Sequence, residues 1–110
     1  MKDHHALTPP QEALTERSLY MAIASLKTVD ECRAFLRDLC TPAEIQAMAD
    51  RWAVVGHLQD GLPYREIYKQ TGVSVTTIGR VARCLAAGQG GYRAVSERLN
   101  GHRLKEHKLG

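Results

Sequence analysis

Small side chains and arginines share one predicted helix face within residues 74–83, and together they suit contact with DNA. A helix must enter a major groove about 12 Å wide, so small leading residues permit close approach while arginines reach phosphate or guanine. The residues of this outer face are Ser74, Val75, Thr76, Gly79, Arg80 and Arg83. Their pattern predicts a DNA-binding face.

Two short helices joined by a tight turn, at about residues 64–85, are the elements that must position this face. Gly72 permits the turn, and Ser74 is the expected N-cap of the second helix. Apolar residues at helical spacing would hold the pair together, namely Ile67, Val73, Ile78, Val81 and Leu85. Tyr68 and Thr71 stand where such units more often carry a small and an apolar residue. The spacing predicts a helix-turn-helix; the alternative is an ordinary helical hairpin whose arginines are only solvated.

The rest of the chain also shows helical patterns, separated by residues that start and stop helices. Expected helices cover residues 9–26, 28–39, 42–60, 63–70, 75–87 and 92–104, with a tail at 105–110. Thr8 is an expected N-cap, Thr28 and Glu31 form a capping-box pattern, and Pro42 takes a first helical position. We therefore expect an all-α protein of six helices in a single domain over residues 1–110.

Charge is distributed unevenly along the chain. Residues 1–63 carry six Lys/Arg against nine Asp/Glu, whereas residues 64–110 carry nine against three. The basic half therefore contains the predicted DNA-binding face. No apolar run reaches the roughly 18 residues of a membrane span, and the first residues lack the hydrophobic stretch of a signal peptide. We expect a cytoplasmic protein with no membrane partner.

Nothing in the sequence indicates catalysis or a metal site. The histidines His4, His5, His57, His102 and His107 match no compact ligand spacing, and no catalytic triad or phosphate-binding loop is recognisable. Cys32, Cys40 and Cys84 show no CxxC spacing and fall at apolar helix positions, so we expect reduced core thiols. Trp52 is likewise expected in the core. The sequence predicts neither an enzyme nor a metalloprotein.

An ordered series of motifs between Thr41 and Leu99 resembles the trp repressor family (Trp operon repressor-like). The series comprises a T-P-x-E opening, an arginine in the third helix, a D-G break, and a turn followed by T-I-x-R. The run TGVSVTTIGRVARCL followed by GxGGYRxVxERL resembles the short trp-repressor-like YerC/YecD-type branch even more closely. The resemblance implies a trp-repressor-like intertwined homodimer with a dimerisation core at 9–62, reading heads at 63–87 and a C-terminal helix.

The same resemblance implies which residues contact double-stranded DNA. The residues at positions that match the family's DNA contacts, together with neighbouring basic residues and the N-cap of the second helix, are Tyr64, Arg65, Tyr68, Lys69, Ser74, Val75, Thr76, Thr77, Gly79, Arg80 and Arg83. We hypothesise that Val75 and Thr76 contact base edges, while Arg65, Lys69 and Arg83 hold the backbone. Two-fold symmetry then requires an approximately palindromic operator with half-sites about 34 Å apart.

The resemblance also points to a small-molecule effector site. Arg51 and Arg80 match the two arginines that hold the corepressor in the trp repressor, and Thr41 matches a residue at the ligand's amino-acid end. The glycine that leaves room for the indole is Val81 here, and a hydroxyl residue is replaced by Cys84. We therefore disfavour L-tryptophan, and either another amino-acid-like or aromatic effector or no effector remains open.

Three functions are compatible with these observations. The first is a homodimeric transcriptional regulator, most simply a repressor. The second is a helical dimerisation or adaptor module that docks a protein partner instead of DNA. The third is another role on DNA, such as replication or recombination, which shares the same motif.

Overall fold

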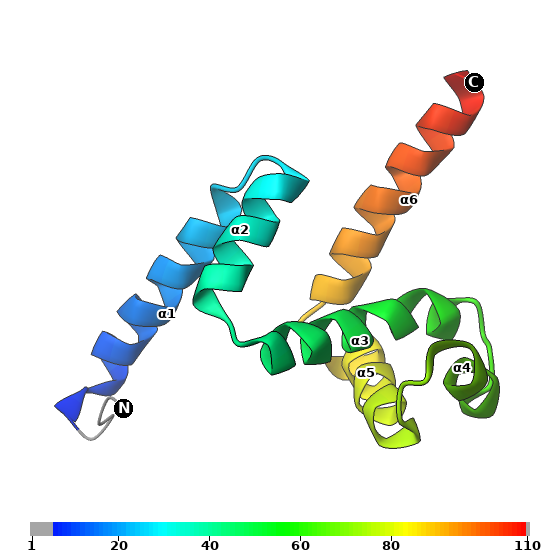
Figure 1. The fold of residues 1–110 in the computed structure, drawn as a ribbon, viewed down its shortest axis with the longest axis horizontal. Helices are drawn as coiled ribbons and strands as arrows, with labels where there is room; N and C mark the ends of the chain where they lie inside the picture. The colour runs from blue at the N-terminus through cyan, green and yellow to red at the C-terminus, as the bar shows by residue number, and fades with distance from the viewer. Residues whose placement is uncertain (1–5, 110) are drawn as a thin grey trace. The chain divides into compact units, whose positions relative to one another are not determined.

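The computed structural model describes the backbone of residues 6–109 and the side chains of residues 6–101. The described residues form six α-helices and no strand, so the predicted all-α fold class is confirmed. The helices are α1 (Pro9–Ala24), α2 (Val29–Leu39), α3 (Pro42–Gln59), α4 (Tyr64–Thr71), α5 (Val75–Ala87) and α6 (Gly91–Leu109) (Figure 1). The chain divides into two compact units, which meet in sequence after Pro42.

The helices of the first unit begin at side-chain caps. Thr8 and Gln11 form a reciprocal capping box at α1, with the Thr8 N–H donating to Gln11 Oε1 at 2.8 Å. At α2 the Glu31 N–H donates to Thr28 Oγ1 at 3.0 Å, as expected. The Glu31 carboxylate accepts from the Lys27 N–H at 2.9 Å, and not from the Thr28 N–H that a capping box would use. Both predicted N-caps are therefore confirmed, and the return bond at α2 is shifted by one residue.

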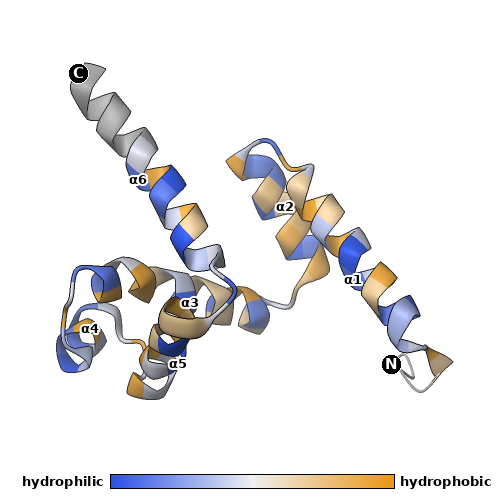
Figure 2. Cartoon of the chain, turned by 180° about the vertical axis from the view of Figure 1, so that it is seen from behind, coloured by the Kyte–Doolittle hydropathy of each residue, from blue (hydrophilic) through white to orange (hydrophobic). Residues whose placement is uncertain are grey.

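Apolar side chains remain uncovered throughout the first unit. Neither α1 nor α2 contains a buried residue. Large apolar residues with more than two-fifths of their surface exposed are Leu14, Tyr20, Met21, Ile23, Val29 and Leu39. Figure 2 shows hydrophobic and hydrophilic residues interspersed along both helices. Within the described residues 6–42 of this unit, no side chain is buried in a core.

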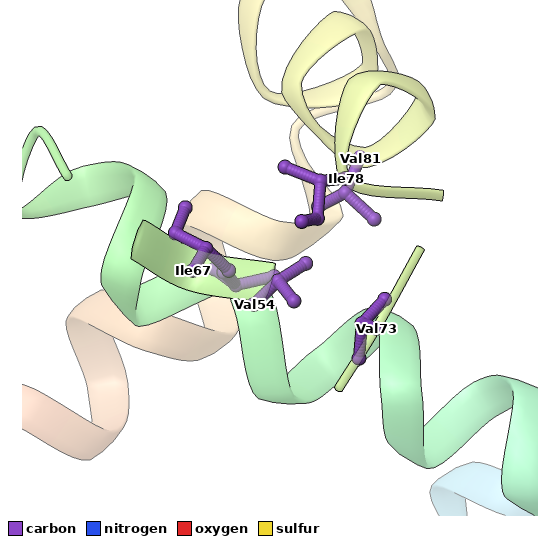
Figure 3. Close-up of a cluster of buried hydrophobic side chains, with 6 residues drawn as sticks. Val54, Ile67, Val73, Ile78 and Val81 are labelled. Atoms are coloured by element: carbon purple, nitrogen blue, oxygen red, sulfur yellow. The ribbon is translucent and has the colours of Figure 1, made fainter. Parts of the chain in front are cut away.

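The second unit, in contrast, contains a compact apolar core. Its fully or almost fully buried residues come from α3, α4, α5 and the turn before α5: Val54, Val55, Ile67, Val73, Ile78 and Val81 (Figure 3). Leu58, Leu62, Leu85 and Tyr92 pack against this cluster. The apolar residues predicted to hold the two helices together therefore do so.

Helix α6 is attached to its neighbours by polar contacts as well as by Tyr92. The Arg93 guanidinium donates from Nε at 3.1 Å and from Nη2 at 2.9 Å to the Leu85 carbonyl at the end of α5. The Gln59 amide donates to the buried Ser96 hydroxyl at 2.9 Å, which connects α3 to α6. These contacts fix the start of α6 against α3 and α5.

The length of α6 differs from the expected C-terminal helix at 92–104. It continues to Leu109 and so includes most of the residues that were expected to form a tail. The helix passes through Gly101, and one glycine costs a helix only about 1 kcal/mol relative to alanine. Among the described helices, none has the length and apolar character that a bilayer crossing requires.

Two expectations about buried residues are wrong for this chain. Trp52 is 41% exposed and stacks on Tyr92 of α6, with ring centroids 6.4 Å apart. Cys84 is exposed, and Cys32 and Cys40 are only half-buried; all three are free thiols. Trp52 and Cys84 both border an open cavity of about 670 Å³ between α3, α5 and the start of α6, which explains their exposure.

Candidate nucleic-acid interface

The turn between α4 and α5 depends on a left-handed backbone at Gly72. Its φ is 74°, and its N–H donates to the Tyr68 carbonyl at 2.8 Å, which ends α4. Residues with a Cβ rarely adopt this conformation, whereas glycine adopts it readily. The predicted role of Gly72 is confirmed.

Thr71 is a polar residue at a turn position where an apolar residue is more common, and its hydrogen bonds show why it suits this turn. Its hydroxyl donates to the Ile67 carbonyl at 2.7 Å and accepts from the Val73 N–H at 3.1 Å. One side chain thus satisfies backbone groups on both sides of the turn. Tyr68 is 53% exposed and therefore does not obstruct the contact between the two helices. The sequence pattern flagged both residues as unusual but did not show these roles.

Ser74 caps the start of α5, as predicted. Its hydroxyl accepts from the Thr77 N–H at 3.2 Å and donates to Thr77 Oγ1 at 3.0 Å. Because this pair of hydroxyls is engaged in the cap, Ser74 and Thr77 fix where the helix begins and which residues its first turn presents. The first residue of the helix proper is Val75.

Helix α5 is buried on one side only. Ile78 and Val81 have no exposed surface, and Leu85 packs on the same core. On the outer side, Val75 is 52% exposed, and Thr76 is exposed as well. Further along the helix, Gly79 is half-buried, and Arg80 and Arg83 are exposed. The outer face expected from the sequence is therefore open.

Basic residues outnumber acidic ones on α4 and α5. Arg65 and Lys69 are exposed on α4. Helix α5 contains no acidic residue, and the only one in α4 is Glu66, which accepts from Gln70 at 3.3 Å. Within residues 6–101, no hydrogen bond or ion pair engages the guanidinium groups of Arg80 and Arg83. Their charge is available to a polyanion.

The structure brings three of the expected DNA-binding residues together at one point. A Cβ built on Gly79 would lie 3.7 Å from Nη1 of Arg83 and 3.9 Å from Cε2 of Tyr64. Tyr64 is the first residue of α4, so the beginning of one helix meets the outer face of the next. No spacing rule applied to the sequence indicates this proximity, because Tyr64 and Gly79 belong to different helices.

The residues of the suggested effector site have mixed environments. Arg51 on α3 is half-buried, Arg80 is exposed, and Val81 is fully buried in the core. Cys84 lines the cavity of about 670 Å³ described above. A second cavity, of about 410 Å³, lies between α3 and α6. Neither of these two cavities is lined by Arg51 or Arg80. Thr41 belongs to the first unit.

Comparison with known proteins places this architecture in a family. The family model described as Trp repressor protein matches residues 15–100. YerC of Bacillus subtilis (strain 168), a protein described as uncharacterized, is 43% identical over 81 residues, which make up 74% of this chain and 78% of YerC.

Two solved structures share the fold over nearly the whole chain. A TrpR-like protein from Eubacterium eligens ATCC 27750 is 38% identical with a TM-score of 0.72, covering 89% of this chain and 96% of the other. A Trp repressor candidate from Staphylococcus aureus is 35% identical with a TM-score of 0.73, covering 91% and 96%. The chain therefore belongs to the Trp repressor family, in the trp-repressor-like branch that includes YerC.

Proposed function

We propose that this protein is a sequence-specific DNA-binding transcriptional regulator, a repressor that occupies a palindromic operator as a homodimer. The observation that carries this proposal is the one-sided burial of α5, with Ile78 and Val81 buried and Val75 52% exposed. A helix held from one side and open on the other is what insertion into a major groove requires. The family supports the same conclusion, because Trp-repressor-like proteins are DNA-binding regulators and not enzymes.

Specific roles follow from the positions of the exposed side chains. Val75 and Thr76 in the first turn of α5 would meet base edges, where their methyl groups suit the methyl group of thymine. Arg65 and Lys69 on α4, together with Arg80 on α5, would contact phosphates on either side of the groove. Ser74 and Thr77 contribute chiefly by fixing the start of α5.

A second copy of the chain is the partner that we propose for α1 and α2. These helices expose Leu14 at 67%, Met21 at 60% and Val29 at 84%, and they bury no residue. Contiguous exposed apolar side chains are normally covered by another surface. Two-fold pairing supplies that cover and also gives two reading helices, which can occupy successive major grooves about 34 Å apart.

Selection from random duplex DNA, followed by titration at several salt concentrations, tests the proposal. We expect a recovered palindrome, and an affinity that falls with log salt at a slope near −0.9 for each phosphate neutralised. An adaptor that docks a protein would bind no duplex, and that outcome would contradict the proposal. Transcription in vitro from a promoter that overlaps the recovered palindrome separates a repressor from a protein of replication or recombination.

Thr76→Glu tests the reading face itself. A carboxylate in the first turn of α5 would approach acceptor groups and phosphates, so we expect specific affinity to fall by at least about tenfold. Gln89→Glu adds the same charge at an exposed position outside α5 and serves as the matched control. Unchanged binding of the Thr76 variant would show that this face is not the one that reads DNA.

We propose further that L-tryptophan is not the effector. Val81 has no exposed surface and packs in the core at the position where the family resemblance calls for a glycine that makes room for the indole. Isothermal titration calorimetry with L-tryptophan should give no saturable heat. Saturation near one ligand per subunit would overturn this proposal, and titration of other amino acids and aromatic acids tests for an effector of another kind.

A further inference from the structure

We propose that Arg83 reads a guanine in the operator, and that Gly79 and Tyr64 are the positioning residues that direct its guanidinium toward the base. This inference rests on the proposed DNA-binding function. It differs from the expectation that Arg83 holds the phosphate backbone, and the difference comes from where the side chain lies.

The Arg83 side chain extends toward the N-terminal end of α5. It begins one turn after Gly79, yet its Nη1 atom lies 3.7 Å from the point that a Cβ of Gly79 would occupy. Helical side chains lean toward the N-terminus, over the preceding turn. The guanidinium therefore lies beside the part of α5 whose residues enter the groove in helix-turn-helix proteins, and not at the trailing end of the helix.

The absence of a side chain at position 79 leaves a notch in the outer face of α5. The Tyr64 ring borders the notch from α4, with Cε2 at 3.9 Å from the same built Cβ. The Tyr64 side chain, which is 40% exposed, and the Arg83 guanidinium therefore border the same notch. A neighbouring ring restricts the conformations of a long side chain and so lowers the entropy lost on binding.

The chemistry of the guanidinium favours guanine as its target. Its planar pair of N–H donors matches the O6 and N7 acceptors of guanine in the major groove, which is the commonest specific arginine contact. Within residues 6–101 no carboxylate engages Arg83, so its donors are available.

Arg83→Ala and Arg83→Lys test the proposal on the operator recovered from the wild-type protein and on its single-base-pair variants. We expect Arg83→Ala to lower operator affinity roughly 5- to 100-fold and to abolish discrimination at one symmetric pair of G·C positions. Affinity for nonspecific duplex should change much less, and Arg83→Lys should not restore the discrimination, because an ammonium group lacks the bidentate geometry.

A uniform loss of affinity across all sequences, with a salt slope reduced by about 1, would instead identify a phosphate contact and overturn the proposal. Failure of the proposed function has a different signature, because the wild-type protein would then bind no duplex at all. Arg80→Ala is the comparison within α5, for which we expect the uniform loss.

Two substitutions at Gly79 test the positioning step. A methyl group makes only ordinary contact with Arg83 and Tyr64 at 3.7 and 3.9 Å, so Gly79→Ala should keep the G·C preference. The larger branched side chain of Gly79→Val would occupy the notch and displace the guanidinium. We expect it to lose the preference, with no further loss when Arg83→Ala is added. If Gly79→Val retained the G·C preference while its circular dichroism melting curve matched that of Gly79→Ala, the notch would have no positioning role.

Discussion

The α4–α5 pair and the α1–α2 pair are both short helical pairs, but only the first is joined to a core of its own. Ile67 and Ile78 are completely buried between α3, α4 and α5, whereas neither α1 nor α2 has a buried residue. Val29 of α2, a residue of the same apolar class, is 84% exposed. The comparison teaches that the α4–α5 pair is stabilised by a core within one chain, whereas the N-terminal helices leave their large apolar side chains exposed.

The largest expected effect is on the core of the reading head. Ile78→Ala removes a fully buried side chain, so the free energy of unfolding should fall by about 2–5 kcal/mol. Val75→Ala, three residues earlier on the exposed side of the same helix, should change it by less than about 0.5 kcal/mol. Urea unfolding followed by circular dichroism measures both. Equal losses would mean that α5 is not buried on one side only.

A charge placed on α1 should act on association. Leu14→Glu puts a carboxylate at a position that is 67% exposed, so we expect little change within the subunit but at least about a tenfold weaker association of the dimer that we propose. Arg33→Glu, at an exposed polar position of α2, is the control. Sedimentation equilibrium measures the dissociation constant. A dimer that withstands Leu14→Glu would exclude this part of α1 from the interface.

The turn offers a smaller and more local test. Gly72→Ala forces a Cβ into a left-handed conformation, at φ 74°, with no atom crowding it, so only backbone strain of about 1–2 kcal/mol is expected. Gly56→Ala, within α3 and equally uncrowded, should leave stability unchanged or raise it by about 0.5–1 kcal/mol. Thermal melting of the two variants gives the comparison, and a stabilising effect at Gly72 would contradict the assigned turn.

The smallest of these expected changes in stability is at Ser74, where two substitutions distinguish an effect on folding from an effect on DNA binding. Ser74→Ala removes the cap of α5 and should cost about 1 kcal/mol, whereas Ser74→Asp keeps a good N-cap and should restore it. The aspartate would also place a negative charge where phosphates approach, so the Asp variant should be stable yet bind operator DNA more weakly than the Ala variant. Melting curves measure the stability of the two variants, and fluorescence anisotropy titrations measure their affinity for the operator. If both variants bound the operator equally well, the DNA phosphates would not lie near Ser74.

Local chemistry made the reading head predictable from the sequence. Gly72 and Ser74 act on their own backbone neighbours, and Ile67 and Ile78 recur at helical spacing, so the turn, the start of α5 and its buried side all follow from residues close in sequence. The N-caps Thr8 and Thr28 were predictable for the same reason, because each also bonds to its own backbone neighbours. The direct contacts that we propose with DNA stay predictions.

The features that escaped prediction depend on contacts between helices. A helical repeat shows that Trp52 and Cys84 lie on apolar faces, but it does not show whether another element covers those faces. The approach of Tyr64 to Gly79, beside Arg83, depends on the crossing of α4 and α5 and has no counterpart in spacing along the chain. The end of α6 lies at Leu109, five residues beyond the expected end, and no glycine or proline occurs between Leu104 and Leu109 to stop the helix earlier.

Arg93 also affects the electric field that α5 presents to its surroundings. The last turn of α5 contains no basic residue, and the carbonyl groups there form the negative end of the helix dipole. By donating twice to the Leu85 carbonyl, the Arg93 guanidinium opposes that negative end with a full positive charge from another helix. An approaching polyanion therefore experiences the positive end of α5 and its arginines with less repulsion from the far end of the same helix.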